Sequence, residues 1–362
     1  MGKMPLIQNR KELRSVLSSA LEKNNEDDEL DFRKKIKTYV IESNFPEVNA
    51  SSVKGFFQIE DTEDQSLKIL KANLSAKNSL RFYLDISDKR FWKLHSLYDS
   101  VATEDVIKKL VEQNYSRLDY LWFSSNLLEK YMGFGKQTGF GLRFKNKFSP
   151  NGNDEEIKDM TMRIWGGGTK DVIDNLRTND RLVKGISLSS IGVNHSVEGG
   201  FTKENISNSG KFTVVTGNSV DSHFTIVEKI KQDYSEKIRQ IEEQRISVEK
   251  NGAGLKFKGS SLFIDFDKPL EDIQSFTDKL ISATNPFRLA GTKQYLDNNH
   301  ARVFALDLHS NDLLNLEITP NWMSIALGHN SCGNVVMRLL TNIQTHLTSQ
   351  VKLMSAENER II

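Results

Sequence analysis

The chain of 362 residues contains a single cysteine, Cys332, and no stretch that approaches the roughly 18 consecutive apolar residues of a membrane-spanning helix. One cysteine cannot form an internal disulfide or supply a multi-cysteine metal site, which is typical of a reducing compartment. The first residues also lack the apolar core of a secretory signal peptide. We therefore expect a cytoplasmic protein that does not associate with a membrane.

An excess of charge of either sign is missing as well. The chain has 49 lysines and arginines against 48 aspartates and glutamates, which gives a formal net charge of +1. Such a protein has no global field that would attract polyanions, so any nucleic-acid site must be a local patch. The content of 38% hydrophobic and 27% charged residues is that of a globular protein.

Short segments in which apolar and polar residues alternate are separated by segments whose apolar residues have helical spacing. This pattern predicts an α+β fold with largely antiparallel sheets and inserted helices. Two helices are expected in residues 9–43, and the second would carry Phe32, Ile36, Val40 and Ile41 on one face. One long amphipathic helix is expected over residues 219–250. The predicted domains are a helical N-terminal segment over 1–45, a small α/β unit over 46–120 and a larger α+β domain over 121–362.

The predicted helix over 219–250 has apolar residues at intervals of three and four, including Tyr234 and Ile238. This spacing fits a helix that packs along the chain's own sheet, and it also fits a coiled-coil seam. A protein partner or a homo-oligomer held through 219–250 is therefore one hypothesis.

Residues 138–148, TGFGLRFKNKF, interleave aromatic and basic residues without an acid. Alternate strand residues point to opposite faces, so the apolar and basic side chains separate. A hairpin partner ending at residue 165 would add further side chains to the basic face. Regularly spaced cations can contact phosphates, and an exposed aromatic ring can stack on an unpaired base. The predicted nucleic-acid-binding residues are Arg143, Lys145, Lys147, Arg163 and Trp165. Alternatively, the cations only solvate the hairpin or guard an edge strand.

Two strand-to-helix junctions are rich in glycine, RIWGGGTKDVIDNLR at 163–177 and ALGHNSCGNVVMRLL at 326–340. Free backbone N–H groups at a helix N-terminus attract anions. The candidate anion-binding residues are Thr169, Lys170, Asn334 and Arg338. Neither junction has the spacing of a P-loop or a dinucleotide fingerprint, and glycine is also the usual residue of sharp turns.

An acidic hairpin is predicted over 303–319, with a three-residue turn and with Phe304 facing the core. This register places Asp307 across from Asn315 and on the same outer face as His309 and Glu317. Together with Asp265 of a neighbouring strand, these side chains could bind Mg²⁺ or Mn²⁺ as cofactor. Polar residues on an exposed hairpin face are equally compatible with no function.

The leading hypothesis is a non-catalytic, cofactor-free nucleic-acid-binding subunit of a larger cytoplasmic assembly, of the kind that acts in prokaryotic genome maintenance or antiviral defence. One alternative is a metal-dependent phosphodiesterase or nuclease that uses the acidic cluster just described. The other is a protein-interaction scaffold that does not contact nucleic acid.

Overall fold

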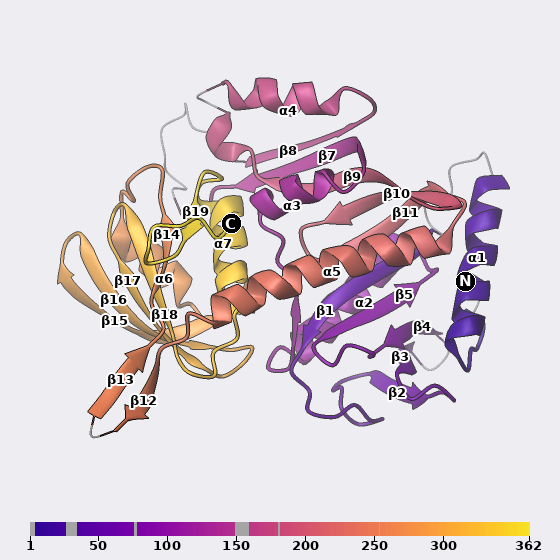
Figure 1. The fold of residues 1–362 in the computed structure, drawn as a ribbon, viewed down its shortest axis with the longest axis horizontal. Coiled ribbons are helices and arrows are strands. Elements are labelled where there is room, and N and C mark those ends of the chain that lie inside the picture. Colours follow the sequence, from indigo (N-terminus) through magenta and orange to yellow (C-terminus); the bar gives the residue numbers. More distant parts are fainter. Residues whose placement is uncertain (1–3, 27–34, 76–77, 149–158, 180–181, 253) are drawn as a thin grey trace. The chain divides into compact units, whose positions relative to one another are not determined.

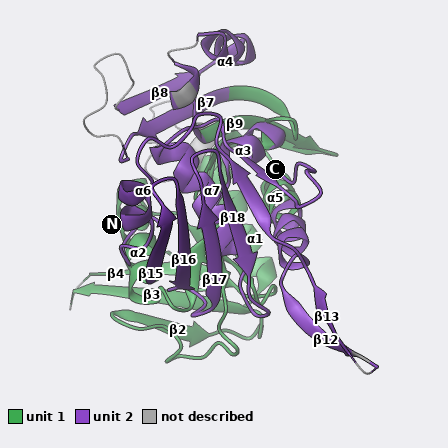
Figure 2. Ribbon diagram, turned by 90° about the vertical axis from the view of Figure 1, so that its left-hand side faces the viewer, with its two compact units in different colours: residues 1–121, 131–138, 190–231 green, residues 122–130, 139–189, 232–362 purple. Residues whose placement is uncertain are grey.

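The computed structural model describes residues 4–26, 35–75, 78–148, 159–179, 182–252 and 254–362. The chain divides into two compact units (Figure 2). The first consists of Met1–Leu121, Tyr131–Thr138 and Ser190–Lys231, and the second of Trp122–Lys130, Gly139–Ser189 and Gln232–Ile362. Each unit therefore combines segments that are far apart in the sequence.

The first unit is built on an antiparallel sheet in which neighbouring strands follow the order β2-β3-β4-β5-β1-β11-β10-β9, and β6 also pairs with β1 (Figure 1). The strands are β1 (Lys37–Ser43), β2 (Phe57–Asp61), β3 (Leu67–Ser75), β4 (Asn78–Asp85), β5 (Phe91–Ser96), β6 (Leu118–Tyr120), β9 (Leu188–Val197), β10 (Gly200–Ser207) and β11 (Lys211–Gly217). Its helices are α1 (Arg10–Glu26), α2 (Ser100–Gln113) and the first half of α5 (Val220–Glu242).

The first predicted N-terminal helix is confirmed as α1, whose Leu13, Leu17 and Leu21 are buried. The second is wrong, because Lys37–Ser43 forms strand β1 and all seven of its residues are buried. A strand covered on both faces shows no alternation of apolar and polar residues, so its short apolar run resembles a buried helix. Residues 27–34, which include Phe32, lie outside the described residues.

The long helix is not confirmed over its full predicted extent, because α5 ends at Glu242. Beyond it, the backbone N–H of Ile246 donates to Leu327, and β12 (Ser247–Asn251) forms a hairpin with β13 (Gly254–Lys258). The apolar residues Ile246 and Val248 are two positions apart, a spacing that also suits a strand. Tyr234 and Ile238 are fully buried within the chain, so they offer no exposed seam for a second copy.

The second unit contains a hairpin of β7 (Lys136–Lys145) and β8 (Asp159–Trp165) and an antiparallel sheet of order β15-β16-β17-β18-β14-β19. These strands are β14 (Leu262–Asp265), β15 (Leu289–Asp297), β16 (His300–Asp307), β17 (Leu313–Ile318), β18 (Trp322–Leu327) and β19 (Lys352–Met354). Its helices are α3 (Ser125–Met132), α4 (Thr169–Arg177), α6 (Ile273–Leu280) and α7 (Asn334–His346), with a short 3₁₀ turn, η1 (Val183–Gly185). The predicted α+β class is confirmed, and the fold is rich in sheet. Among the described helices, none is both long and apolar enough to cross a membrane.

Four buried polar side chains of the first unit form one hydrogen-bonded chain. Thr38 Oγ1 lies 2.8 Å from His95 Nδ1 and 2.7 Å from His223 Nε2, and His223 Nδ1 lies 2.7 Å from Glu204 Oε1. A carboxylate can only accept, so we assign the His223 proton to Nδ1 and let the Thr38 hydroxyl donate to Nε2. Thr38 then accepts from His95. The chain ties helix α5 to strands β1, β5 and β10.

Because of this network, the free energy of unfolding should depend on pH. Burial, followed by the electrostatic interaction with His223, lowers the pKa of His95 from 6.5 to about 3. Between these values the unfolded chain binds a proton that the folded protein does not. The free energy of unfolding should therefore fall as the pH drops, by about 1.4 kcal/mol per pH unit from this residue. Denaturant unfolding from pH 6.5 to pH 4 measures the slope. His95→Asn should make this slope shallower by about 1.4 kcal/mol per pH unit, which corresponds to one proton. An equal slope in both proteins would contradict the assignment.

Candidate nucleic-acid interface

The predicted basic hairpin is present as β7 and β8, and its register places the basic residues on one face. Arg143 pairs with Thr161, Gly141 with Arg163, and Gly139 with Trp165. The side chains of Phe140, Leu142 and Phe144 point the other way and are at most 2% exposed. The separation into an apolar inner face and a basic outer face is thus confirmed.

The outer face of the hairpin carries the exposed cations Arg143, Lys145 and Arg163, and the exposed Lys147 follows two residues after the end of β7; we call these four residues the basic row. Asp159 is the strand partner of Lys145. Within the described part of the chain, however, no carboxylate forms an ion pair with any member of the row. The four cations are therefore free of described ion pairs, although Asp159 lies on the same face beside Lys145.

The backbone that carries the row is anchored to other elements of the second unit. The N–H of Arg143 donates to Ser187 at 2.9 Å, and the N–H of Lys147 donates to the carbonyl of His346 at 3.0 Å. Lys279 of α6 donates to the carbonyl of Lys147 at 2.5 Å, which adds a fifth cation beside the row. These contacts hold the row in place where β7 ends.

The cations are close enough to affect one another. Burial, and then the charges of Lys145 and Arg143, lower the pKa of Lys147. His346, whose Nδ1 donates to the carbonyl of Lys145 at 3.0 Å, has a pKa lowered to about 4. Burial is the largest cause of this shift, and the charges of Lys147, Arg143 and Lys145 add to it. Repulsion of this kind favours an anionic partner.

Trp165 lies at the end of the row, and the residue is 43% exposed. Its ring lies over Gly139, where a Cβ atom would come within 1.9 Å of ring atom Cε3. Glycine at position 139 therefore lets the indole lie against the strand. A flat ring that is supported from below and partly exposed is the geometry of a stacking platform.

The two glycine-rich junctions differ. At the first, Thr169 begins α4 and is buried, whereas Lys170 is exposed and Gly168 has φ 72° with no side-chain cap. At the second, the backbone N–H of Gly333 donates to Glu242 at 2.9 Å, and Asn334 accepts from the hydroxyl of Tyr234.

Arg338 lies one turn further along α7 and is fully buried. Its Nε donates to the carbonyl of Phe287 at 2.9 Å, and its guanidinium pairs with Asp307. The predicted anion-binding residues Asn334 and Arg338 thus bond to the protein's own groups.

The predicted register of the acidic hairpin is wrong. Asn315 pairs with Phe304, not with Asp307, and Phe304 is 51% exposed. The connection from β16 to β17 spans residues 308–312 and is longer than the predicted three-residue turn. The carboxylate of Asp307 accepts from the backbone N–H and the hydroxyl of Ser310 and so stabilises this connection. Asp307 and His309 are consequently buried.

The alternative catalytic cluster is therefore not assembled on one face. Glu317 pairs with Arg302 across the strands and accepts from His300 Nε2 at 2.7 Å, on the face opposite to Asp307. Asp265 is exposed at the end of β14. Because Asp307 is already paired with a guanidinium and Glu317 lies across the sheet, these residues do not fit a shared Mg²⁺ or Mn²⁺ site.

A family model described as "MJECL33-like protein" matches residues 1–362. The "Uncharacterized protein MJECL33" of Methanocaldococcus jannaschii is 28% identical to this chain over an alignment length of 360, and the alignment covers 88% of the chain and 86% of that relative. Neither description names a ligand or a reaction, so a functional proposal rests on the geometry of the interface.

Proposed function

The chain belongs to the MJECL33-like protein family, and we propose that it is a non-catalytic protein that binds single-stranded nucleic acid on the outer face of the β7–β8 hairpin. The observation that supports this most is the basic row, whose exposed cations have no described carboxylate partner. An overall charge of +1 makes such a local concentration of cations unusual for this chain.

The spacing of the row suits a linear polyanion. Arg143 and Lys145 occupy alternate positions of β7, so their side chains are about 7 Å apart along the extended backbone, and Lys147 follows two residues further on. Arg163 of the neighbouring strand widens the positive surface beside Gly141. A strand of phosphates that follows β7 would contact several of these cations in turn and release its counterions.

Trp165 is the reason for proposing a single strand. Base pairing and stacking in a duplex hide the faces of the bases, whereas an unpaired base can stack on the exposed indole. Arginine and lysine side chains alone would not distinguish the two forms.

Fluorescence anisotropy with labelled single-stranded and duplex oligonucleotides over a salt series tests the proposal. Four phosphate contacts predict that log Kobs falls against log salt with a slope of about −3 for single strands. Tighter binding of the duplex would contradict it. Absence of binding would instead favour a row that only protects the edge strand β8 from pairing.

Trp165→Ala should weaken binding of single strands by about 1–3 kcal/mol, because it removes the stacking platform but no charge. The salt slope should stay the same, and binding to a duplex should change little. Trp165→Phe is the matched control, since it keeps an aromatic ring on Gly139. If the alanine variant binds single strands as tightly as the parent protein does, the stacking role is wrong.

A further inference from the structure

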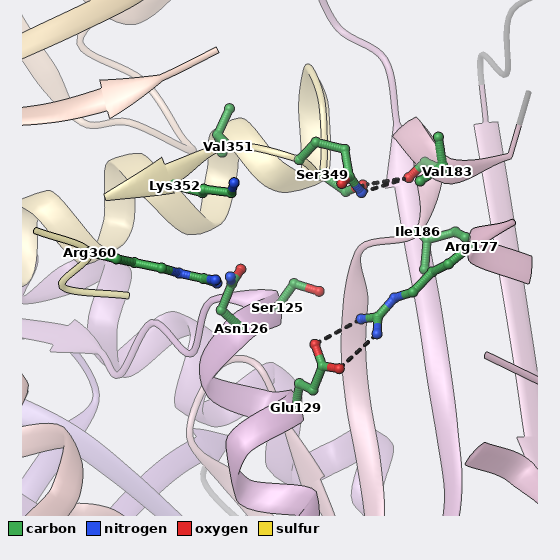
Figure 3. A pocket seen from close by; sticks show the side chains of 11 residues that line it. Ser125, Asn126, Glu129, Arg177, Val183, Ile186, Ser349, Val351, Lys352 and Arg360 are labelled. Atoms are coloured by element: carbon green, nitrogen blue, oxygen red, sulfur yellow. Dashed lines mark hydrogen bonds and ion pairs between the residues drawn. The ribbon is translucent and has the colours of Figure 1, made fainter. Parts of the chain in front are cut away.

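A cavity of about 350 Å³ lies within the second unit, and its residues do not include any member of the basic row. Four segments form it: the first turns of α3, the last residue of α4, the region of η1, and the C-terminal segment from Ser349 to Arg360 (Figure 3). The volume is at the small end of the roughly 300–1,000 Å³ typical of ligand pockets.

Cations outnumber acids around this cavity. The charged lining residues are Arg177, Lys352 and Arg360 against the single carboxylate of Glu129. Glu129 accepts two hydrogen bonds from Arg177, at 2.7 and 2.8 Å, so these two charges offset each other. Lys352 and Arg360 are exposed, and no described carboxylate forms an ion pair with either of them. In Figure 3 both enter from the C-terminal segment, while the Arg177–Glu129 pair stands at another side.

The cavity also has an apolar part and a fixed frame. Ile186 and Val351 line it and are 3% and 1% exposed. Ser349 Oγ and Gln350 Nε2 both donate to the carbonyl of Val183, at 2.8 and 3.2 Å, which fastens the C-terminal segment to η1. The position of the two cations relative to the apolar residues is therefore set by the fold.

We propose that this cavity binds a small organic molecule that carries a phosphate monoester. The phosphate lies between the ammonium group of Lys352 and the guanidinium of Arg360, and the organic part occupies the rest of the cavity, whose accessible lining is mainly polar. The side-chain amide of Asn126, which Figure 3 shows beside Arg360, can donate a further hydrogen bond, while the backbone N–H of Ser125 and the side-chain oxygen of Asn126 already bond to Gln344. This site does not depend on nucleic-acid binding by the basic row.

The carboxylate of Glu129 should weaken phosphate binding in two ways. It repels the phosphate and holds Arg177, so Glu129→Gln removes the repulsion and releases a third cation toward the ligand. This variant should bind the ligand several-fold more tightly than the parent protein, whereas a purely structural ion pair would give no gain.

Isothermal titration calorimetry with AMP, adenosine and inorganic phosphate tests the assignment. AMP should bind, adenosine should not, and inorganic phosphate should bind more weakly than AMP. Lys352→Gln and Arg360→Gln should each weaken AMP binding about tenfold or more, because each removes a charge-assisted hydrogen bond. Lys256→Gln, at an exposed position of β13, is the matched control and should leave binding unchanged.

Equal binding of AMP and adenosine, or an unchanged affinity in the well-folded Lys352→Gln variant, would overturn the proposal. If a 5′-phosphorylated dinucleotide binds and AMP does not, the cavity binds the terminal phosphate of a nucleic-acid strand and not that of a mononucleotide. If neither phosphorylated probe binds, the cavity is not a phosphate site. A protein with Arg143, Lys145 and Lys147 all replaced by glutamine should bind AMP as the parent protein does. AMP binding in the cavity and nucleic-acid binding by the basic row can therefore be tested independently.

Discussion

Replacing Arg143, Lys145 and Lys147 together with glutamine should lower the affinity for single-stranded oligonucleotides at least about tenfold and make the salt slope shallower by about 2. The reason is that three phosphate contacts disappear while the backbone of β7 keeps its hydrogen bonds to Ser187 and His346. Anisotropy titrations at several salt concentrations give both quantities.

The matched control replaces three exposed lysines elsewhere, Lys11 of α1, Lys108 of α2 and Lys256 of β13, and changes the net charge by the same amount. This control should bind nearly as the parent protein does. If both triple variants lose affinity equally, binding depends on total charge and not on the basic row.

The second large effect concerns stability. Glu204→Leu should lower the free energy of unfolding by about 1–3 kcal/mol, because it leaves the Nδ1–H group of His223 buried without its acceptor. Both side chains are fully buried, so water cannot replace the lost hydrogen bond. Chemical denaturation of the variant and the parent protein at pH 7 provides the comparison.

Glu204→Gln keeps an acceptor for His223 Nδ1 and should be destabilised much less. Replacing both partners, as Glu204→Leu with His223→Leu, should recover only part of the loss, since the unpaired imidazole is gone but the hydroxyl of Thr38 loses its acceptor Nε2. A double variant that is less stable than the Glu204→Leu single variant would show that the pair acts mainly through packing.

Local alternation was enough to predict the outer face of the β7–β8 hairpin. Phe140, Leu142 and Phe144 separate cleanly from Arg143 and Lys145, and a shift of one residue would bury the charges. The two strands are also consecutive in the sequence. Under these conditions the period of the pattern determines which side chains face the solvent.

The same reasoning failed for β16 and β17, because both faces of β16 carry apolar residues. The sequence favoured the larger Phe304 and Leu306 for the core, but the buried positions are Ala301, Val303 and Ala305. The register depends on Asp307, which holds the turn and pairs with Arg338, 31 residues away. A local pattern contains no information about such a partner.

Two neighbours of the basic row could not be predicted either. His346 contacts Lys145 across 201 residues of sequence, and Lys279 contacts Lys147 across 132. Neither residue belongs to a recognisable motif. Only the fold brings them to the end of β7, where the histidine responds to the charge of the row.

The pKa of His346 responds to that charge, in addition to the larger effect of burial. Nuclear magnetic resonance of the histidine ring over pH 3–7 should give a value of about 4 in the free protein. With a saturating single-stranded oligonucleotide, the phosphates offset the charges of Arg143, Lys145 and Lys147, so the pKa of His346 should rise toward its ordinary value of about 6.5. An unchanged pKa in the presence of bound oligonucleotide would place the nucleic acid elsewhere and contradict the account.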